Sequence, residues 1–329
     1  MNRTKSAFPA WKTFAAAAAA ATALGAAPAA AEGFPEREIQ MIIPFGPGGA
    51  TDIIFRLIAT EAEQHLGGTI VPVNMAGAGA TRGSRHVHDA APDGYTVLAS
   101  HDTIALSQLA GMVDYSYDAF EAVALLTQTI NMPATHADHP VQSAEEIAAY
   151  VAENPGQVRF GMIPTSTDHF FWAQFFDAAG IDIDDVRLVG YSDTGEQVAA
   201  MLAQELDFAM FNLPSGGSHF EAGTFRPLGV AHVERLDAIP DVPTLNELGI
   251  ELEHATSRGL FYPAGTPQEA IDALAAAFGA ALENEELQAR IENEFGSVVR
   301  FLAGDDYLAF LEENKAGLAS AAEKIDFDG

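Results

Sequence analysis

The most restrictive feature of the sequence is a strand, a glycine-rich turn and a helix that follow one another directly. Residues 39–45 are mostly apolar, residues 46–49 read Gly-Pro-Gly-Gly, and an amphipathic stretch follows over residues 51–66. Glycine punctuates such patterns because it adopts backbone conformations that other residues avoid. The order predicts a buried strand that turns sharply into a helix.

This unit then repeats. Residues 70–73 predict a second strand, residues 76–83 a turn of small residues, residues 85–91 a short helix, and residues 95–99 the next strand. Strands that alternate with helices at this spacing pair in parallel through crossover helices. The first hundred residues therefore predict an α/β fold.

A second α/β set follows the long apolar run at residues 120–132, which we expect to leave the first set as a strand. Ser143 and Glu146 form a capping-box pattern that predicts a helix start. The elements expected in the second set are helices at residues 143–153, 168–179 and 194–203 and strands at residues 158–161, 187–189 and 207–211.

The last third of the chain predicts a strand at residues 258–262 and then helices at 267–284, 285–295 and 305–324, without strands of their own. We expect these helices to cover the first set. Lobe one then comprises residues 32–131 and 255–329, and lobe two residues 132–254. Two crossings between lobes, near residues 130 and 255, make a hinge.

The N-terminus predicts export. Arg3, Lys5 and Lys12 precede an alanine-rich apolar run, and three alanines end at Ala31, which is the pattern of a cleaved signal peptide over residues 1–31. The chain has no cysteine, so it has no acceptor for a lipoprotein anchor and no disulfide. The mature protein is expected free of the membrane and monomeric.

Charge limits the partners of the mature chain. Cleavage removes three of the 16 basic residues and leaves 13 against 46 acidic ones, a net charge of −33. Such a surface repels polyanions at long range. Nucleic acid and anionic membrane surfaces are therefore not expected partners.

Three turns could bind an anion, because each follows a predicted strand and precedes a predicted helix: residues 46–52, 77–81 and 191–195. Backbone N–H groups at a helix start are unpaired and carry the positive end of the helix dipole. For any single turn, a purely conformational role of the glycines is the simpler interpretation. Three turns at strand ends that face one cleft favour binding of a carboxylate.

Motifs of enzymes and cofactor sites are missing. Arg82 stands where a dinucleotide-binding turn at Gly77 and Gly79 needs its third glycine, and neither GxxxxGK[ST] nor GxSxG occurs. Residues 100–102 read Ser-His-Asp, but direct neighbours cannot form a catalytic relay. The histidine pairs lack a third metal ligand at suitable spacing. We expect no cofactor, no metal and no enzymatic activity.

Arg258 is the strongest single candidate. It lies in Ser-Arg-Gly at a predicted strand start and at the predicted hinge. A guanidinium can hold a carboxylate with two parallel hydrogen bonds. The alternative is an ion pair with one of the many acidic residues, and composition leaves both interpretations open.

Several segments together carry a resemblance to a known family. FGPGGATD, VNMAGAGA and APDGYTVL are followed by TSTDHFF, GYSDTGE, RPLGVAHVERLDAIPDVPTLNELGI and RGLFYPAGTP. With these segments the chain resembles the substrate-binding receptors of tripartite tricarboxylate transporters over nearly all of its mature length. Asp193 stands where a lysine or a small residue is common in the family, and Ser257 replaces the usual tryptophan.

The resemblance implies a type II periplasmic-binding-protein fold, with two α/β lobes that close around a di- or tricarboxylate. It implies a periplasmic location and two membrane partner proteins that carry out transport. The residues expected at the ligand are Phe45, Gly48, Gly49, Ala50, Thr51, Asp52, Gly77, Ala78, Gly79, Ala80, Thr81, Thr165, Ser166, Thr167, Asp168, His169, Ser192, Asp193, Thr194, Gly195 and Arg258. A sensor module that presents its ligand to a membrane receptor would have the same sequence, and a secreted hydrolase is the more remote alternative.

Overall fold

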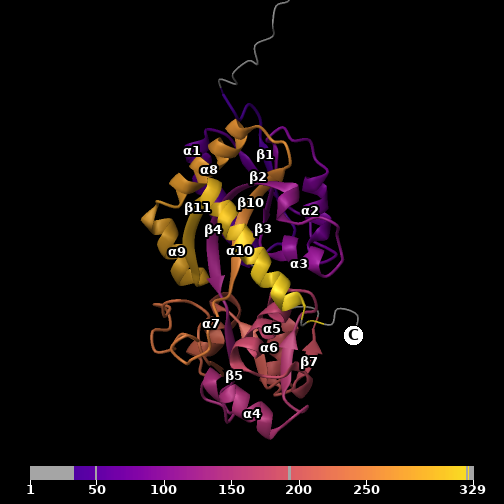
Figure 1. The fold of residues 1–329 in the computed structure, drawn as a ribbon. Helices are drawn as coiled ribbons and strands as arrows, with labels where there is room; N and C mark the ends of the chain where they lie inside the picture. Colours follow the sequence, from indigo (N-terminus) through magenta and orange to yellow (C-terminus); the bar gives the residue numbers. More distant parts are fainter. Residues whose placement is uncertain (1–32, 49, 192–193, 324, 326–329) are drawn as a thin grey trace, which may run out of the picture. The chain divides into compact units, whose positions relative to one another are not determined.

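The computed structural model describes residues 33–48, 50–191, 194–323 and 325. By its internal contacts the chain divides into two units, Met1–Gly33 and Phe34–Gly329. Figure 1 shows that the second unit contains two groups of strands, each surrounded by helices. None of its described helices is both long and apolar enough to span a bilayer.

The first group is a six-stranded mixed sheet in the order β11-β4-β10-β3-β1-β2. Its strands are β1 (Ile39–Ile43), β2 (Ile70–Asn74), β3 (Thr96–Ser100), β4 (Phe120–Ile130), β10 (Ala255–Pro263) and β11 (Ser297–Ala303). Strand β1 pairs in parallel with β2 and β3, whereas β10 and β11 pair antiparallel with β4. The parallel part is what the repeated strand–turn–helix units predict.

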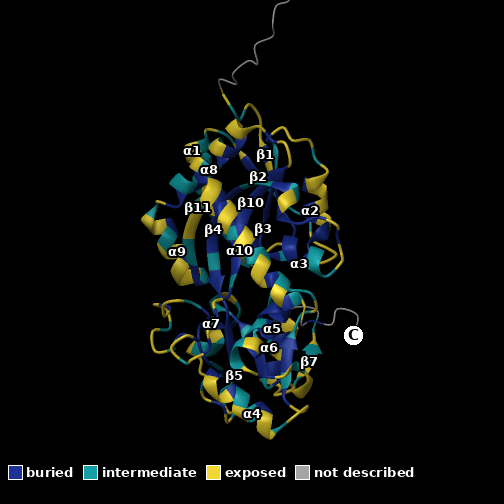
Figure 2. Ribbon diagram, viewed as in Figure 1, coloured by how far each residue is buried: buried dark blue, intermediate teal, exposed yellow. Residues whose placement is uncertain are grey.

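Helices cover both faces of this sheet, and together they form lobe one. They are α1 (Ala50–Leu66), α8 (Gln268–Ala281) and α9 (Glu285–Phe295) on one face and α2 (Thr81–His88), α3 (Thr103–Leu109) and α10 (Gly304–Ala322) on the other. Met41 and Ile43 pack into the first core and Ile42 into the second, because successive side chains of a strand point to opposite faces. Figure 2 shows the buried strands between helices whose outer faces are exposed.

The second group, lobe two, is a five-stranded sheet in the order β7-β6-β8-β5-β9. Its elements are β5 (Met132–His136), α4 (Ile147–Glu153), β6 (Arg159–Met162), α5 (Thr167–Ala179), β7 (Arg187–Gly190), α6 (Thr194–Leu202), β8 (Phe208–Phe211), α7 (Leu213–Glu221) and β9 (Phe225–Pro227). The core of lobe two is rich in aromatic rings around Trp172, whose indole N–H donates to the carbonyl of Gly161 at 2.9 Å.

Two segments connect the lobes side by side. One is the step from β4 to β5 at Asn131, and the other is the entry into β10 at His254. The backbone N–H of Asn131 donates to the carbonyl of His254 at 3.1 Å, and their side chains lie 3.0 Å apart. The predicted two-crossing connection between two α/β lobes is therefore present.

Two sequence-based expectations are wrong, and two helices are not predicted. The C-terminal helices do have a strand among them, β11, which lies at the sheet edge; its run of apolar residues is short and lies between two predicted helices. Helices α3 and α7 are not predicted by the sequence, and the glycines and serines of α7 resemble a loop. The capping box at Ser143 does not form: its hydroxyl has no hydrogen-bond partner, and Glu146 accepts instead from the backbone N–H of Gln142 at 2.7 Å. The lobe boundaries at residues 131 and 254 remain a prediction.

Candidate functional site

Arg258 lies within β10, close to where the chain enters lobe one, and is buried. Its Nε donates to the hydroxyl of Thr51 at 3.1 Å, and its Nη1 donates to the hydroxyl of Thr129 and to the carbonyl of Thr256. Thr51 belongs to the first turn of α1 and Thr129 to β4. The guanidinium is thus held between the hinge strands and the start of the first helix.

The charge of Arg258 has no ion-pair partner in the described parts of the chain. Burial lowers the pKa of Arg258 to about 10, so the guanidinium stays protonated at neutral pH. Burial raises the pKa of the nearby Asp102 to about 7, although the backbone N–H of Ser257 donates to its carboxylate at 3.2 Å. Hydroxyl groups therefore orient a cation that forms no direct ion pair with a described carboxylate, although Asp102 is close enough to interact with its charge.

His101 is a further titratable residue close to Arg258. Its ring stacks on Phe45, with centroids 4.5 Å apart, and its Nδ1 is buried without a hydrogen-bond partner. Burial, with a smaller effect of the positive Arg258, lowers the pKa of His101 to about 3. The imidazole is neutral, and it forms no relay with Ser100, whose hydroxyl lies 3.3 Å from that of Thr103.

The turn before α1 uses one of its own backbone N–H groups for an internal hydrogen bond. The N–H of Gly48, expected at the ligand, donates to Asp52 at 2.9 Å. Arg56 donates to the same carboxylate at 2.7 Å and Asn74 at 2.8 Å. Burial alone would raise the pKa of Asp52, but these hydrogen bonds outweigh it and lower the pKa. Asp52 therefore fixes the turn, while Ala50 and Thr51 open the helix; Gly49 lies outside the described residues.

The second turn, over residues 77–80, has four successive positive φ angles of 130°, 49°, 59° and 71°. Two of these residues are Ala78 and Ala80, for which the left-handed region costs about 1 kcal/mol or more each. Thr81 then opens α2, and its hydroxyl donates to the carbonyl of Ala78 at 2.6 Å. Non-glycine residues in this region cluster at ligand sites.

The loop before α5 in lobe two is held by a buried carboxylate. Asp168 accepts from the hydroxyl of Ser166, from the N–H of Ile163 at 2.9 Å and from Gln197 of α6 at 2.7 Å. Burial nevertheless raises the pKa of Asp168. This network joins the loop to α6, which begins at Thr194 and has Gly195 in its first turn. Ser192 and Asp193 lie outside the described residues.

The remaining residues of that loop are also constrained. Thr165 has a φ of 62°, and its N–H donates to Nδ1 of His169 at 3.2 Å. Burial lowers the pKa of His169, so the ring is neutral at pH 7. Thr167 opens α5. In each lobe, one of the loops expected at the ligand therefore holds a non-glycine residue in a left-handed conformation.

Comparison with known proteins decides the family. A sequence profile described as tripartite tricarboxylate transporter family receptor matches residues 54–321. The chain belongs to this family. The protein BugT of Bordetella pertussis is 31% identical over 234 residues, which are 70% of this chain and 71% of BugT.

Solved structures agree with this assignment. MatC from Rhodopseudomonas palustris, solved with bound malate, is 27% identical, with a TM-score of 0.74 over 88% of this chain and 100% of MatC. A solute-binding protein of the same family from Polaromonas has a TM-score of 0.76 at 23% identity, over 89% of this chain and 100% of its own, and so shares the fold. The predicted two-lobed periplasmic-binding-protein fold is confirmed. The family consists of periplasmic solute-binding receptors rather than enzymes.

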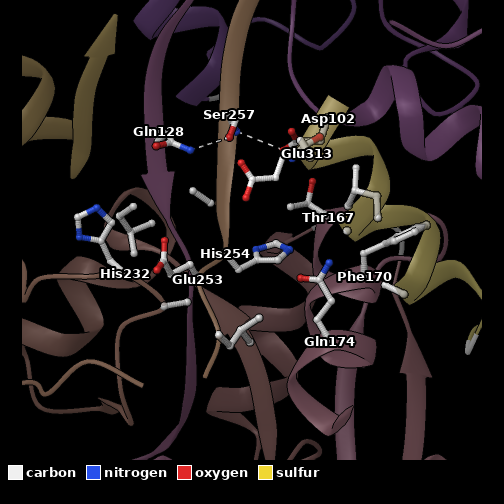
Figure 3. Close-up of a pocket in the computed structure, with 18 of the residues that line it drawn as sticks. Asp102, Gln128, Thr167, Phe170, Gln174, His232, Glu253, His254, Ser257 and Glu313 are labelled. Atoms are coloured by element: carbon white, nitrogen blue, oxygen red, sulfur yellow. Dashed lines mark hydrogen bonds between the residues drawn. The ribbon is translucent and has the colours of Figure 1, made fainter. Parts of the chain in front are cut away.

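The receptor also contains a cavity of about 1100 Å³ on the other side of β10. Arg258 and Ser257 are neighbours on this strand, and Ser257 points into the cavity together with Gln128 and Asp102 (Figure 3). Its walls come from α5, α10 and the hinge, and they carry Glu253 and Glu313. The lining has five acidic residues and one arginine, Arg300, which disfavours a carboxylate, although Thr167, one of the residues expected at the ligand, also lines this cavity.

Several residues that shape the receptor's site are not predicted by the sequence. Thr129 and Gln197 are ordinary polar residues in apolar segments, and nothing in their neighbourhood along the chain marks them. Residues 101 and 102 stand out in the sequence only as part of a false catalytic triad. Their position gives a better signal: His101 directly follows β3, at the same sheet edge as the turns after β1 and β2.

Proposed function

We propose that this receptor binds a small di- or tricarboxylate between its lobes and delivers it to the membrane subunits of a tripartite tricarboxylate transporter. In this proposal residues 1–31 are a signal peptide, and the mature protein is a periplasmic monomer that needs no metal or cofactor. The observation that carries the proposal is Arg258, a buried guanidinium held by hydroxyl groups next to the turn that opens α1.

Two carboxylates need two sets of donors. Backbone N–H groups of the turns at residues 46–52 and 77–81 can hold one carboxylate near a helix start. Arg258 can hold the second with charge-assisted hydrogen bonds, which contribute roughly 1.5–3 kcal/mol each. The malate bound to MatC is a dicarboxylate and supports this class of ligand.

A thermal-shift screen of residues 32–329 against mono-, di-, tri- and aromatic carboxylates tests the proposal. A ligand present at 100 times its Kd stabilises the folded state by about 2.7 kcal/mol and raises the unfolding midpoint. We expect di- or tricarboxylates to raise it most, with calorimetry on the strongest ligand giving one site per chain. No shift with any carboxylate would refute the proposal.

Delivery to a transporter needs a separate experiment. We expect the tagged receptor to copurify with small membrane proteins from its native host when the ligand is present. Copurification with a membrane receptor kinase would instead support the sensor function that the sequence leaves open, without changing the ligand class.

A further inference from the structure

Met112 is an exposed apolar side chain that lies between the two lobes. It follows α3 in lobe one and is 41% exposed. Its methyl group covers Gly79 so closely that a Cβ added there would lie 3.0 Å from it. Its sulfur lies 3.9 Å from the hydroxyl oxygen of Thr165, in lobe two. One side chain therefore touches a predicted ligand turn of each lobe.

The backbone of Met112 is fixed although the side chain is exposed. Its N–H donates to the carbonyl of Ser107 at 2.9 Å, and the Ser107 hydroxyl donates to the carbonyl of Gly79 at 3.2 Å. Gly111 before it adopts a φ of 68°, and Val113 after it is buried in the core of lobe one. Helix α3 thus holds both the turn at Gly79 and the residue that covers it.

The contact with lobe two is of a kind that can break and re-form. The hydroxyl of Thr165 has one hydrogen, and the carbonyl of Pro164 accepts it at 2.6 Å. The approach of the Met112 sulfur is therefore mainly a dispersion contact, which is weak for each atom pair and has little directional requirement. A thioether on three rotatable bonds also adapts to small changes in the position of its neighbour.

We propose that Met112 is a gate residue of the carboxylate site. Its side chain bridges the turns at Gly79 and Thr165 when the lobes are closed, and the ligand leaves after this bridge opens. Met112 supplies no charge or hydrogen-bond donor, so it governs the residence time of the ligand rather than its chemical class. This inference rests on the proposed function, because it assigns a role within the same cleft.

Stopped-flow kinetics with the dicarboxylate that gives the largest thermal shift test the gate. In the Met112→Ala variant we expect the dissociation rate to rise about fivefold, a loss of roughly 1 kcal/mol, with the association rate within twofold of the parent. Met112→Leu should retain parent-like dissociation because it preserves the apolar volume. Leu308→Ala, which removes an apolar side chain that is 51% exposed on α10, is the matched control and should change neither rate. A dissociation rate of Met112→Ala within twofold of the parent would overturn the proposal.

A second measurement does not depend on kinetics. With ¹³C-labelled methionine methyl groups, the Met112 signal is identified by its loss in Met112→Leu, and nuclear Overhauser effects are recorded on the protein saturated with the same dicarboxylate. We expect contacts from the methyl group to both Gly79 and Thr165. A contact to Gly79 alone rules out the bridge even if carboxylates bind. A parent that binds no carboxylate refutes the proposed function and this inference with it, whereas binding without the Thr165 contact refutes the inference alone.

Discussion

Arg258 donates a hydrogen bond from Nε to the hydroxyl of Thr51, 207 residues away in the chain, at 3.1 Å. The receptor has 46 acidic residues, yet threonine hydroxyls rather than carboxylates orient this buried cation. A hydroxyl accepts a hydrogen bond without cancelling the positive charge. The arrangement therefore keeps a buried guanidinium charged and fixed in place, as the proposed binding of an anion requires.

Asp102 should make the stability of the receptor depend on pH. Burial raises its pKa in the folded state to about 7, above the usual value of 3.8. Between these values the folded state binds a proton that the unfolded state has released, so this group's contribution to stability falls as pH rises from about 4 to 7. Asp102→Asn removes the titration. We expect urea unfolding to show the variant gaining stability relative to the parent between pH 4.5 and pH 8.

His101 and His254 titrate with the opposite sign, because burial lowers their pKa values to about 3 and about 4. Both histidines are present in parent and variant, and their contribution largely cancels in the difference. A difference in unfolding free energy that stays constant from pH 4.5 to pH 8 would show that Asp102 does not titrate in this window.

Asp52 should stabilise the fold rather than contact the ligand. It accepts from Gly48, Arg56 and Asn74, and its pKa is lowered, so its stabilisation is present above pH 3.8 and is lost as pH falls through the folded value. We expect Asp52→Asn to cost about 1–3 kcal/mol at pH 7. Chemical denaturation measures this cost. Asp118→Asn, an exposed partner of Lys315, is the control and should cost less than about 1 kcal/mol.

The sequence predicts the parallel half of lobe one well, because each glycine turn there separates one strand from one helix. It fails where long-range pairing decides the structure. Strand β11 forms by antiparallel pairing with the outer edge of β4. Most of its own residues are only partly buried. Propensity along the chain carries no information about such a partner.

The candidate site shows the same contrast between local sequence patterns, which can be predicted, and long-range contacts, which cannot. Arg258 and the turns could be found from the sequence because residue type and position relative to strand ends indicate a role. The partners of these residues could not, since Thr51 meets Arg258 and Gln197 meets Asp168 only in the folded chain. Nor could the sequence indicate that Asp52 occupies the N–H of Gly48, which reduces the number of donors left for a ligand.

Gly259 should not tolerate a side chain. A Cβ at this position would collide with the hydroxyl of the buried Tyr307 and lie 2.8 Å from the carbonyl of Ala124. Overpacking of this kind costs about 1–3 kcal/mol. We expect Gly259→Ala to lower stability by this amount in urea unfolding, and Tyr307→Phe to restore part of the loss because it removes the hydroxyl.

A glycine in open surroundings provides the control for this prediction. Gly317 lies in α10 with no atom within 4 Å of an added Cβ. Gly317→Ala should therefore leave stability unchanged or raise it by up to about 1 kcal/mol. Equal effects of the two substitutions would contradict the steric argument.

Arg258 carries the sharpest prediction about binding. Arg258→Ala should weaken the binding of the best di- or tricarboxylate at least tenfold in calorimetry, because one charge-assisted hydrogen bond is worth roughly 1.5–3 kcal/mol. Arg258→Lys should recover part of the affinity, since an ammonium keeps the charge but loses the planar two-pronged geometry. Monocarboxylates should respond less to either change. Arg300→Ala removes the same charge from an exposed position near the hinge and controls for long-range electrostatics.

A structural role of Arg258 would give a different pattern. Its hydrogen bonds to Thr51 and Thr129 join α1 to β4, so Arg258→Ala should also lower stability, whatever the residue does for the ligand. Thr129→Val removes one of these bonds and leaves the charge in place, which separates the two roles. If the guanidinium binds the ligand, Thr129→Val should retain affinity within a few fold while Arg258→Ala loses it. If Arg258→Ala binds within about twofold of the parent, a change of roughly 0.5 kcal/mol, then Arg258 only holds the hinge together and the second carboxylate of the ligand is bound elsewhere.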